Sequence, residues 1–263
     1  MAGAAAESAV KMHMQHTIVA QVIRAIGDAE FMAVTAQSIC QHLEFELVAI
    51  VSHRLNGKPL LMFDNFDVTG GRRGLENYIE ATHAVNPILE LATRREGAFR
   101  ARDFVIRAGK IGALAPYVVR SADEELGFRT VGWPERLEEI GLYFKAMSAI
   151  IEVSLYRPRG RRPADRDSLQ KLEELRPALA AAFNKHATLA PGELAQVLVS
   201  QSLLTPRETE ITELLLRGCD TRNIALRLAI SRHTVKDHRK QIFRKLGIGT
   251  LAQLFCLFRQ RTQ

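Results

Sequence analysis

The last quarter of the chain carries a close succession of helix start and stop signals. The segment TPRE at 205–208 is typical of a helix N-terminus. Thr205 can cap the helix and Glu208 can complete a capping box, while Pro206 suits the first helical position. Gly218 can end the helix, because glycine accepts the left-handed backbone found there. This spacing constrains the region to short helices.

Three more helices are expected after Gly218. Thr221 can cap a short helix through RNIALRLA, and Ser231 can cap a third, RHTVKDHRKQIFRKL, that ends at Gly247. A fourth begins near Thr250, and its apolar side carries Leu251, Leu254, Phe255 and Phe258. Because only residues 229–231 join the second helix to the third, the pattern predicts a helix-turn-helix.

The predicted third helix divides into an apolar and a polar face at 100° per residue. Val235, Ile242 and Leu246 fall within a narrow apolar arc. The opposite side carries His233, Lys236, Asp237, Lys240, Gln241 and Arg244. A recognition helix in the major groove of DNA needs this division, since lysines can donate to guanine and Asp237 can accept from cytosine. Taken alone, such a face is also compatible with a merely solvated helix.

The charge of the chain is concentrated in the same region. The whole sequence has 36 Lys and Arg against 29 Asp and Glu, a net charge of +7. Residues 200–263 hold 12 of the basic and 5 of the acidic residues, so the remainder is balanced at 24 of each. This asymmetry favours an acidic polymer as partner, duplex DNA first and a membrane surface second.

The segment 204–248 resembles the DNA-binding domain of LuxR/NarL-type regulators. The resemblance rests on LTPRE at 204–208, Gly218, Ile224, Ala225, Leu228, Ser231, Thr234, Val235, Lys236, His238, Lys245, Leu246 and Gly247. It implies that Lys236, Asp237 and Lys240 read bases. It also implies that Thr221, Ser231, Thr234, His238 and Lys245 approach the DNA backbone or support the helix, and Arg244 joins them from the polar face.

Two residues of the third helix depart from the family pattern. Arg239 stands where an aliphatic residue is usual, at the edge of the apolar arc, and its stem can snorkel there. Asp237 is an uncommon base reader, which leaves the DNA sequence open. The hydroxyls of Ser231 and Thr234 can bond phosphate oxygens with help from the helix N-terminus.

The sequence before residue 187 predicts an α+β domain. Helices are expected at 9–31, 33–43, 73–93 with a break at Asn86-Pro87, and 168–185. Strands are expected at 45–53, 59–66, 140–147 and 149–156, the first two joined by a hairpin at Asn56-Gly57. The fold class is therefore an α/β/α sandwich-like domain with a small, mainly antiparallel sheet, followed by an all-α four-helix domain. We place the first domain at 1–186, a linker at 187–203 and the helix-turn-helix domain at 204–263.

The first domain is expected to be a sensor or a dimerisation scaffold. It opens with a helix, whereas a phosphoacceptor receiver opens with a strand ending in paired acids, and the chain has no GxxxxGK[ST] of an ATPase. The remaining resemblance is to the autoinducer-binding or GAF-like input domains of LuxR-type proteins. ENYIEATHAVNPILELA, residues 76–92, is faintly similar to the autoinducer-domain segment with an Asp-Pro pair.

Two departures from the pattern of autoinducer-binding domains leave the identity of the ligand open. Asn86 lacks the carboxylate that holds the amide of a lactone ligand, and the expected tryptophan is absent, the only one being Trp133. Three alternatives remain: a lactone, a different small apolar or amphipathic ligand, and no ligand. The candidate pocket residues are Phe63, Phe66, Tyr78, Asn86 and Trp133, each of which can equally be a core residue.

Other classes of function find little support. No apolar run is long enough to span a membrane, and Cys40, Cys219 and Cys256 are too far apart for a zinc motif. Without GxSxG or another catalytic signature, we expect no enzyme, no metal and no cofactor. The sequence predicts a cytoplasmic homodimeric transcription regulator that binds double-stranded DNA. The alternatives are an N-terminal enzyme fused to a DNA-binding tail, and an interaction adaptor.

Overall fold

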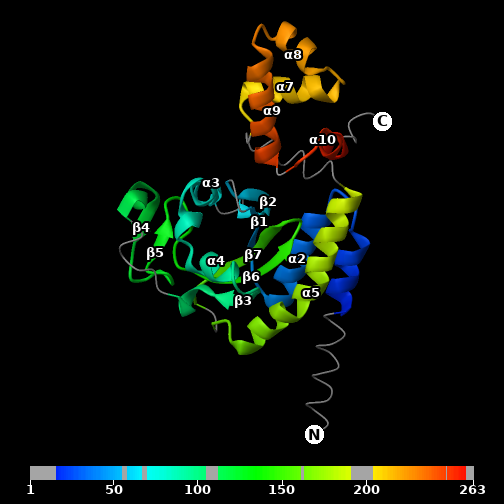
Figure 1. The fold of residues 1–263 in the computed structure, drawn as a ribbon. Helices are drawn as coiled ribbons and strands as arrows, with labels where there is room; N and C mark the ends of the chain where they lie inside the picture. Colours follow the sequence, from blue (N-terminus) through cyan, green and yellow to red (C-terminus); the bar gives the residue numbers. More distant parts are fainter. Residues whose placement is uncertain are drawn as a thin grey trace. The chain divides into compact units, whose positions relative to one another are not determined.

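A computed structural model describes residues 16–54, 58–66, 70–104, 112–160, 163–190, 204–246 and 248–258. The chain divides into two compact units, Met1–Leu189 and Ala190–Gln263, which we describe one at a time (Figure 1). Several predicted features lie outside the described residues, namely the start of the predicted helix at 9–31, the Asn56-Gly57 turn, most of the predicted linker at 187–203, and Gly247.

The first unit is built around a five-stranded antiparallel sheet. Its strand order is β2 (Leu60–Asp64), β1 (Leu47–His53), β7 (Ala149–Pro158), β6 (Leu137–Ala146) and β3 (Gly97–Arg100). Both predicted strand pairs are present in antiparallel register. The β6–β7 hairpin turns through Met147 and Ser148, which both have positive φ, 54° and 58°. Such a two-residue turn matches the twist of paired strands.

Helices cover one face of this sheet. Residues 16–24, α2 (Phe31–Leu43) and α5 (Arg166–Leu189) pack against it, and Figure 1 shows α2 and α5 side by side. The predicted apolar stripe of α5 is buried at Leu172, Leu175, Leu179 and Phe183. On the helix at 16–24, Ile23 is 57% exposed. The buried stripe there is narrow, with Ile18 and Val22 one turn apart.

The opposite face carries shorter elements. They are α3 (Arg72–Glu80), α4 (Pro87–Ala92), the 3₁₀ turns η2 (Thr82–Val85), η3 (Ala101–Asp103) and η5 (Gly112–Tyr117), and a small sheet of β4 (Val118–Arg120) and β5 (Phe128–Thr130). Side chains of β1 alternate between the two faces: Val48 and Ile50 join the helical core, whereas Ala49 and Val51 face this side. The expected α/β/α layering with an antiparallel sheet is confirmed.

The arginine-rich stretch RPRGRRP at 157–163 suggests a solvated loop, but its first two residues belong to a strand. Strand β7 runs to Pro158, and Arg157 is buried, with its Nε 2.9 Å from Oε2 of Glu138 on the neighbouring strand. Its guanidinium also lies 4.4 Å above the ring of Phe45. Arg157 is thus a core ion-pair residue rather than a solvated loop cation, because the cross-strand register places Glu138 opposite it.

The second unit contains α7 (Pro206–Leu216), α8 (Thr221–Arg227), α9 (Arg232–Leu246) and α10 (Leu251–Phe258), as the capping signals predict. Its core is formed by Ile211, Leu215, Ile224, Val235, Ile242, Leu246 and Leu254. Phe255 was expected on the apolar side of the last helix but is 37% exposed. Among the described residues, no helix has the length and hydropathy that crossing a membrane requires.

Candidate functional site

The N-terminus of α9 is organised by two hydroxyl side chains. Oγ of Ser231 accepts the backbone N–H of Thr234 at 3.0 Å, which confirms Ser231 as the cap. The two hydroxyls also lie 2.8 Å apart, within hydrogen-bond distance of each other. Both side chains are therefore held at the start of the helix, where unpaired backbone N–H groups favour an anion.

The cap of α8 differs from the expected one. Asp220, not Thr221, precedes the first helical residue, and its Oδ1 accepts the N–H of Asn223 at 2.7 Å. A cap must have an extended backbone to place its side chain beside the third helical N–H. Asp220 has that backbone, with φ −77° and ψ 167°. Thr221 becomes the first residue of the helix, and its hydroxyl is not needed for capping.

The two faces of α9 are those that the sequence predicts. Val235, Ile242 and Leu246 are buried. The opposite side exposes His233, Lys236, Asp237, Lys240, Gln241 and Arg244. Asp237 lies 3.4 Å from Nε2 of His233, whereas no ion pair to Lys236 or Lys240 forms within the described part of the chain. Two lysine charges thus face outward one helical turn apart.

Other side chains of α9 attach the helix to its own unit. Nζ of Lys245 lies 2.6 Å from Oε2 of Glu208, the residue that completes the capping box of α7. Burial alone would raise the pKa of Glu208, but hydrogen bonds from Lys245 and Thr205 outweigh it and lower the pKa. The guanidinium of Arg239 lies 5.2 Å from the ring centroid of Phe243, so its stem covers the edge of the core.

His238 belongs neither to the exposed face of α9 nor to its buried face. It is half-buried, and its Nδ1 is buried without a hydrogen-bond partner among the residues that the structure describes. The family resemblance implies that Lys245 either approaches the DNA backbone or supports the helix. Its contact with Glu208 gives it the supporting role. Ser231 and Arg244 remain exposed to solvent.

A second candidate site is a cavity in the first unit, of about 80 Å³. Three of the five predicted pocket residues, Tyr78, Asn86 and Trp133, line it. Phe66 is fully buried against Trp133, with ring centroids 5.0 Å apart, and supports the wall from behind. Phe63 was predicted in the same pocket, but it packs into the helical core on the other face of the sheet, next to Ile50 in the strand register.

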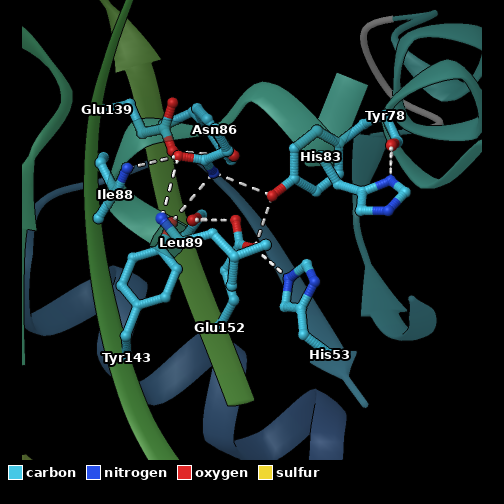
Figure 2. Close-up of polar contacts among 11 residues, drawn as sticks. His53, Tyr78, His83, Asn86, Ile88, Leu89, Glu139, Tyr143 and Glu152 are labelled. Atoms are coloured by element: carbon cyan, nitrogen blue, oxygen red, sulfur yellow. Dashed lines mark hydrogen bonds and ion pairs between the residues drawn. The ribbon is translucent and has the colours of Figure 1, made fainter. Parts of the chain in front are cut away.

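The strand register gathers polar side chains on the cavity face of the sheet. Glu139 lies opposite Tyr156, and Tyr143 lies opposite Glu152, on neighbouring strands. Because side chains alternate between the faces of a sheet, β6 and β7 direct all four toward the same side. Figure 2 shows three of them, Glu139, Tyr143 and Glu152, around Asn86.

Glu152 is a buried carboxylate that contacts three polar side chains. Its Oε2 lies 2.5 Å from Nε2 of His53 and accepts the hydroxyl of Tyr78 at 2.7 Å (Figure 2). Its Oε1 accepts the hydroxyl of Ser154 at 2.8 Å. Burial would raise the pKa of Glu152, but these hydrogen bonds and the His53 charge lower it. Glu152 therefore remains ionised inside the unit.

Asn86 has a structural role as well as a place in the cavity wall. Its Oδ1 accepts the N–H groups of Ile88 at 2.9 Å and Leu89 at 3.3 Å, which caps α4. Its Nδ2 donates to the hydroxyls of Tyr78 at 3.0 Å and Tyr143 at 3.5 Å. The amide thus joins the start of α4 to the tyrosine network, and it brings no charge to the cavity.

Glu139 is the acid that β6 contributes to the wall of the cavity. It lines the cavity, and no described cation forms an ion pair with it. The hydroxyl of Tyr156 donates to Oε1 of Glu139 at 3.4 Å, and the hydroxyls of Ser154 and Tyr156 both favour the ionised form of Glu139. Burial, together with the charges of Glu152 and Glu125, raises the pKa of Glu139 to about 8.

Sequence reasoning missed both Glu139 and Glu152. The signal that marks them is an acid inside an otherwise apolar strand, as in LEEIGLYF and AIIEVSL. In a sheet covered on both faces, such an acid must be buried and therefore needs a partner or a function.

Comparisons with known proteins agree with the geometry of the second unit. Residues 202–258 match the model of the family "Bacterial regulatory proteins, luxR family". An HTH-type transcriptional regulator in the exeN 3′ region of Aeromonas salmonicida is 33% identical over 150 residues, which cover 50% of this chain and 75% of that protein. The spore germination protein GerE of Bacillus subtilis is 45% identical over 54 residues, which cover 20% of this chain and 73% of that protein. The predicted resemblance of segment 204–248 is confirmed.

Solved structures match the chain at low similarity, and one of them covers part of it. The ligand-binding domain of VqsR from Pseudomonas aeruginosa aligns with a TM-score of 0.44 and 16% identity, covering 66% of this chain and 96% of that one.

Proposed function

Since this chain belongs to the luxR family of bacterial regulatory proteins and is a DNA-binding transcriptional regulator, we propose that it binds duplex DNA as a homodimer with α9 in the major groove. The observation that carries this proposal is the exposed basic face of α9 opposite the buried Val235, Ile242 and Leu246. A helix with that division of side chains fits the major groove. Family membership favours regulation over the enzyme and adaptor alternatives, and we place the protein in the cytoplasm, with its DNA.

The proposal assigns different tasks to the side chains of α9. Lys236, Asp237 and Lys240 contact base edges, because they project from its exposed face. Phosphate contacts come from Thr221, Ser231, Thr234 and Arg244. We assign His238 and Lys245 to support of the helix.

We assign dimerisation and sensing to residues 1–189, where the first compact unit ends. A single helix-turn-helix domain reads a short site, so two-fold dimers on a pseudo-palindromic sequence supply the remaining affinity. A small ligand in the cavity beside Trp133 controls the regulator, since this is the site where aromatic and polar side chains of the unit converge.

The test uses a duplex that the full-length protein selects from a random-sequence pool. Lys236→Ala and Lys240→Ala should each weaken binding of this duplex by roughly 1–3 kcal/mol, as measured by fluorescence anisotropy. Arg217→Ala is the matched control, because Arg217 is an exposed cation of the same unit outside α9. Equal affinity for the two lysine variants and the control would show that α9 does not read the DNA.

A further inference from the structure

The aromatic side chains of the cavity form a corner rather than a stack. Ring centroids are 6.1 Å apart for Tyr78 and Trp133, and 5.3 Å apart for Trp133 and Tyr156, at interplanar angles of 61° and 68°. All three residues line the cavity. The faces of aromatic rings carry negative electrostatic potential and attract cations that lie within about 6 Å of the ring centroid.

The charged side chains of the lining are mostly acidic. Glu124, Glu125 and Glu139 contribute carboxylates, and Arg129 contributes one guanidinium. That guanidinium is already paired, with Glu135 and with Glu124, from which its Nε lies 3.5 Å away. Arg129 therefore cannot serve as a free receptor for an anionic ligand, and an anion would be repelled by the carboxylates.

Glu139 differs from the other acids in what surrounds it. Glu124 forms ion pairs with Arg129 and with Arg159, whose Nη2 lies 3.2 Å from Oε2 of Glu124. The side chain of Glu139, by contrast, has only hydroxyl contacts among the described residues. The neighbouring Glu152 is hydrogen-bonded by His53, Tyr78 and Ser154. An ionised carboxylate at the wall of a cavity costs stability, so Glu139 favours its protonated form unless a ligand brings a compensating positive charge.

We propose that the cavity binds a small organic cation, a protonated amine or a quaternary ammonium, with its charge beside Glu139 and its carbon atoms against Trp133, Tyr156 and Tyr78. This proposal rests on the proposed function in taking the cavity as the ligand site, and it names the chemical class of the ligand. A volume of about 80 Å³ restricts the ligand to a few non-hydrogen atoms unless the walls move.

The remaining polar groups are consistent with a cation. The amide of Asn86 is fully engaged by Tyr78, Tyr143 and the start of α4, so position 86 supplies no charge. The carboxylate comes instead from β6, at Glu139. The raised pKa of Glu139, about 8, has the same physical origin, because burial and the charges of Glu152 and Glu125 disfavour its ionised form more than the hydroxyls of Ser154 and Tyr156 favour it.

Trp133 provides a direct readout, since it is the only tryptophan of the chain and lines the cavity. Full-length protein is titrated with a series of cations from methylammonium to choline, and with 3,3-dimethylbutan-1-ol, the uncharged carbon analogue of choline. We expect a saturable change of Trp133 fluorescence with the cations, and the neutral analogue should bind at least about 10-fold more weakly than choline.

Glu139→Gln keeps the shape of the side chain and removes its charge. It should weaken binding of the cation by about 10-fold or more. Glu80→Gln, an exposed carboxylate of the same unit paired with Lys58, is the control and should leave binding unchanged. A thermal melt establishes that each variant is folded. If Glu139→Gln does not fold, the comparison of the cations with the neutral analogue still decides the question.

Two results would overturn the cation proposal. Equal binding of choline and its neutral analogue, unaffected by Glu139→Gln, would make the cavity a site for neutral ligands. No fluorescence response to any cation of the series would reject the class as well. Neither result touches the DNA-binding proposal, which depends on the anisotropy of the α9 variants, so the two failures are distinguishable.

Discussion

Single carboxylates hold much of the local structure of the second unit. Oε2 of Glu208 receives both the N–H of Thr205, at 2.7 Å, and the ammonium of Lys245, at 2.6 Å. One side chain therefore completes the cap of α7 and attaches α9 to it. Asp220 has the corresponding task at α8, where Oδ1 accepts the N–H of Asn223.

Substitutions at Asp220 and Thr221 test which of the two residues caps α8. Asp220→Ala should lower the free energy of unfolding of the second unit by about 1 kcal/mol, because an N-terminal N–H of α8 loses its acceptor. Thr221→Ala should stay within roughly 0.5 kcal/mol of the wild type. Urea unfolding followed by circular dichroism measures both, while Trp133 fluorescence reports the first unit separately. If Thr221→Ala lowered the free energy of unfolding more than Asp220→Ala, Thr221 would be the cap.

The ionisation of Glu139 should make the stability of the first unit depend on pH. Its pKa rises from 4.5 to about 8 on folding, so the folded state holds the proton more tightly than the unfolded chain. The stability that this proton contributes is fully present below pH 4.5 and is lost as the pH rises toward 8. Glu152 and Glu125 face the same carboxyl and strengthen the effect.

Glu139→Gln does not titrate and should therefore become more stable than the wild type as the pH rises. The measurement is the urea midpoint from Trp133 fluorescence at intervals between pH 5 and pH 8.5, where the difference between variant and wild type should grow with pH. A difference that stays constant over this range would mean that Glu139 is ionised throughout.

At the scale of elements, α3 packs tightly against the loop that carries Trp133. A Cβ on Gly74 would lie 2.5 Å from the backbone N of Trp133 and 2.7 Å from the carbonyl carbon of Gly132. Backbone atoms cannot yield to such a contact as a flexible side chain can. The 132–133 loop, which places Trp133 in the cavity wall, can thus approach α3 this closely only because residue 74 has no side chain.

Gly74→Ala should force α3 and the 132–133 loop apart. We expect a loss of about 1–3 kcal/mol in the stability of the first unit, as for other overpacked sites, together with a shifted emission maximum of Trp133. Gly112→Ala is the control, because a Cβ there meets nothing within 4 Å. An unchanged spectrum and unfolding midpoint for Gly74→Ala would show that the contact relaxes freely.

At the scale of the whole molecule, the charge of the chain and its proposed two-fold assembly act together. All of the net +7 lies after residue 199, so DNA attraction belongs to the second unit and should weaken steeply with salt. Dimerisation then brings two basic units to one duplex. The second contact is intramolecular and benefits from a high effective concentration.

Full-length protein should therefore bind a complete two-half-site duplex about 100-fold more tightly than a duplex with one half randomised. Anisotropy at two salt concentrations measures the ratio, and analytical ultracentrifugation gives the mass of the free protein. A ratio near one, or a monomer at concentrations where the full site is saturated, would contradict a preformed dimer.

Short-range signals account for what the sequence predicted well. The cap of α7, the stripe of α5, the break before Pro87 and the β6–β7 hairpin each depend on residues a few positions apart. Such patterns express local backbone geometry and the burial of one face, so they can be interpreted without the rest of the fold. The family resemblance of residues 204–248 is of the same kind, since its motif is nearly continuous.

The cavity, by contrast, was decided by contacts between distant segments. Tyr78 and His53 reach Glu152 across 74 and 99 residues of chain, and no local pattern predicts which acid of which strand they meet. Phe63 and Phe66 are close in sequence but belong to different cores, because β2 ends at Asp64 and only Phe66 follows the chain to the cavity side. The sequence alone determined the helices and strands, the fold class and the basic face of α9. The tertiary structure decided which carboxylates are paired and that Glu139 is left to face the cavity, since burial and electrostatic pairing depend on distances that only the folded chain defines.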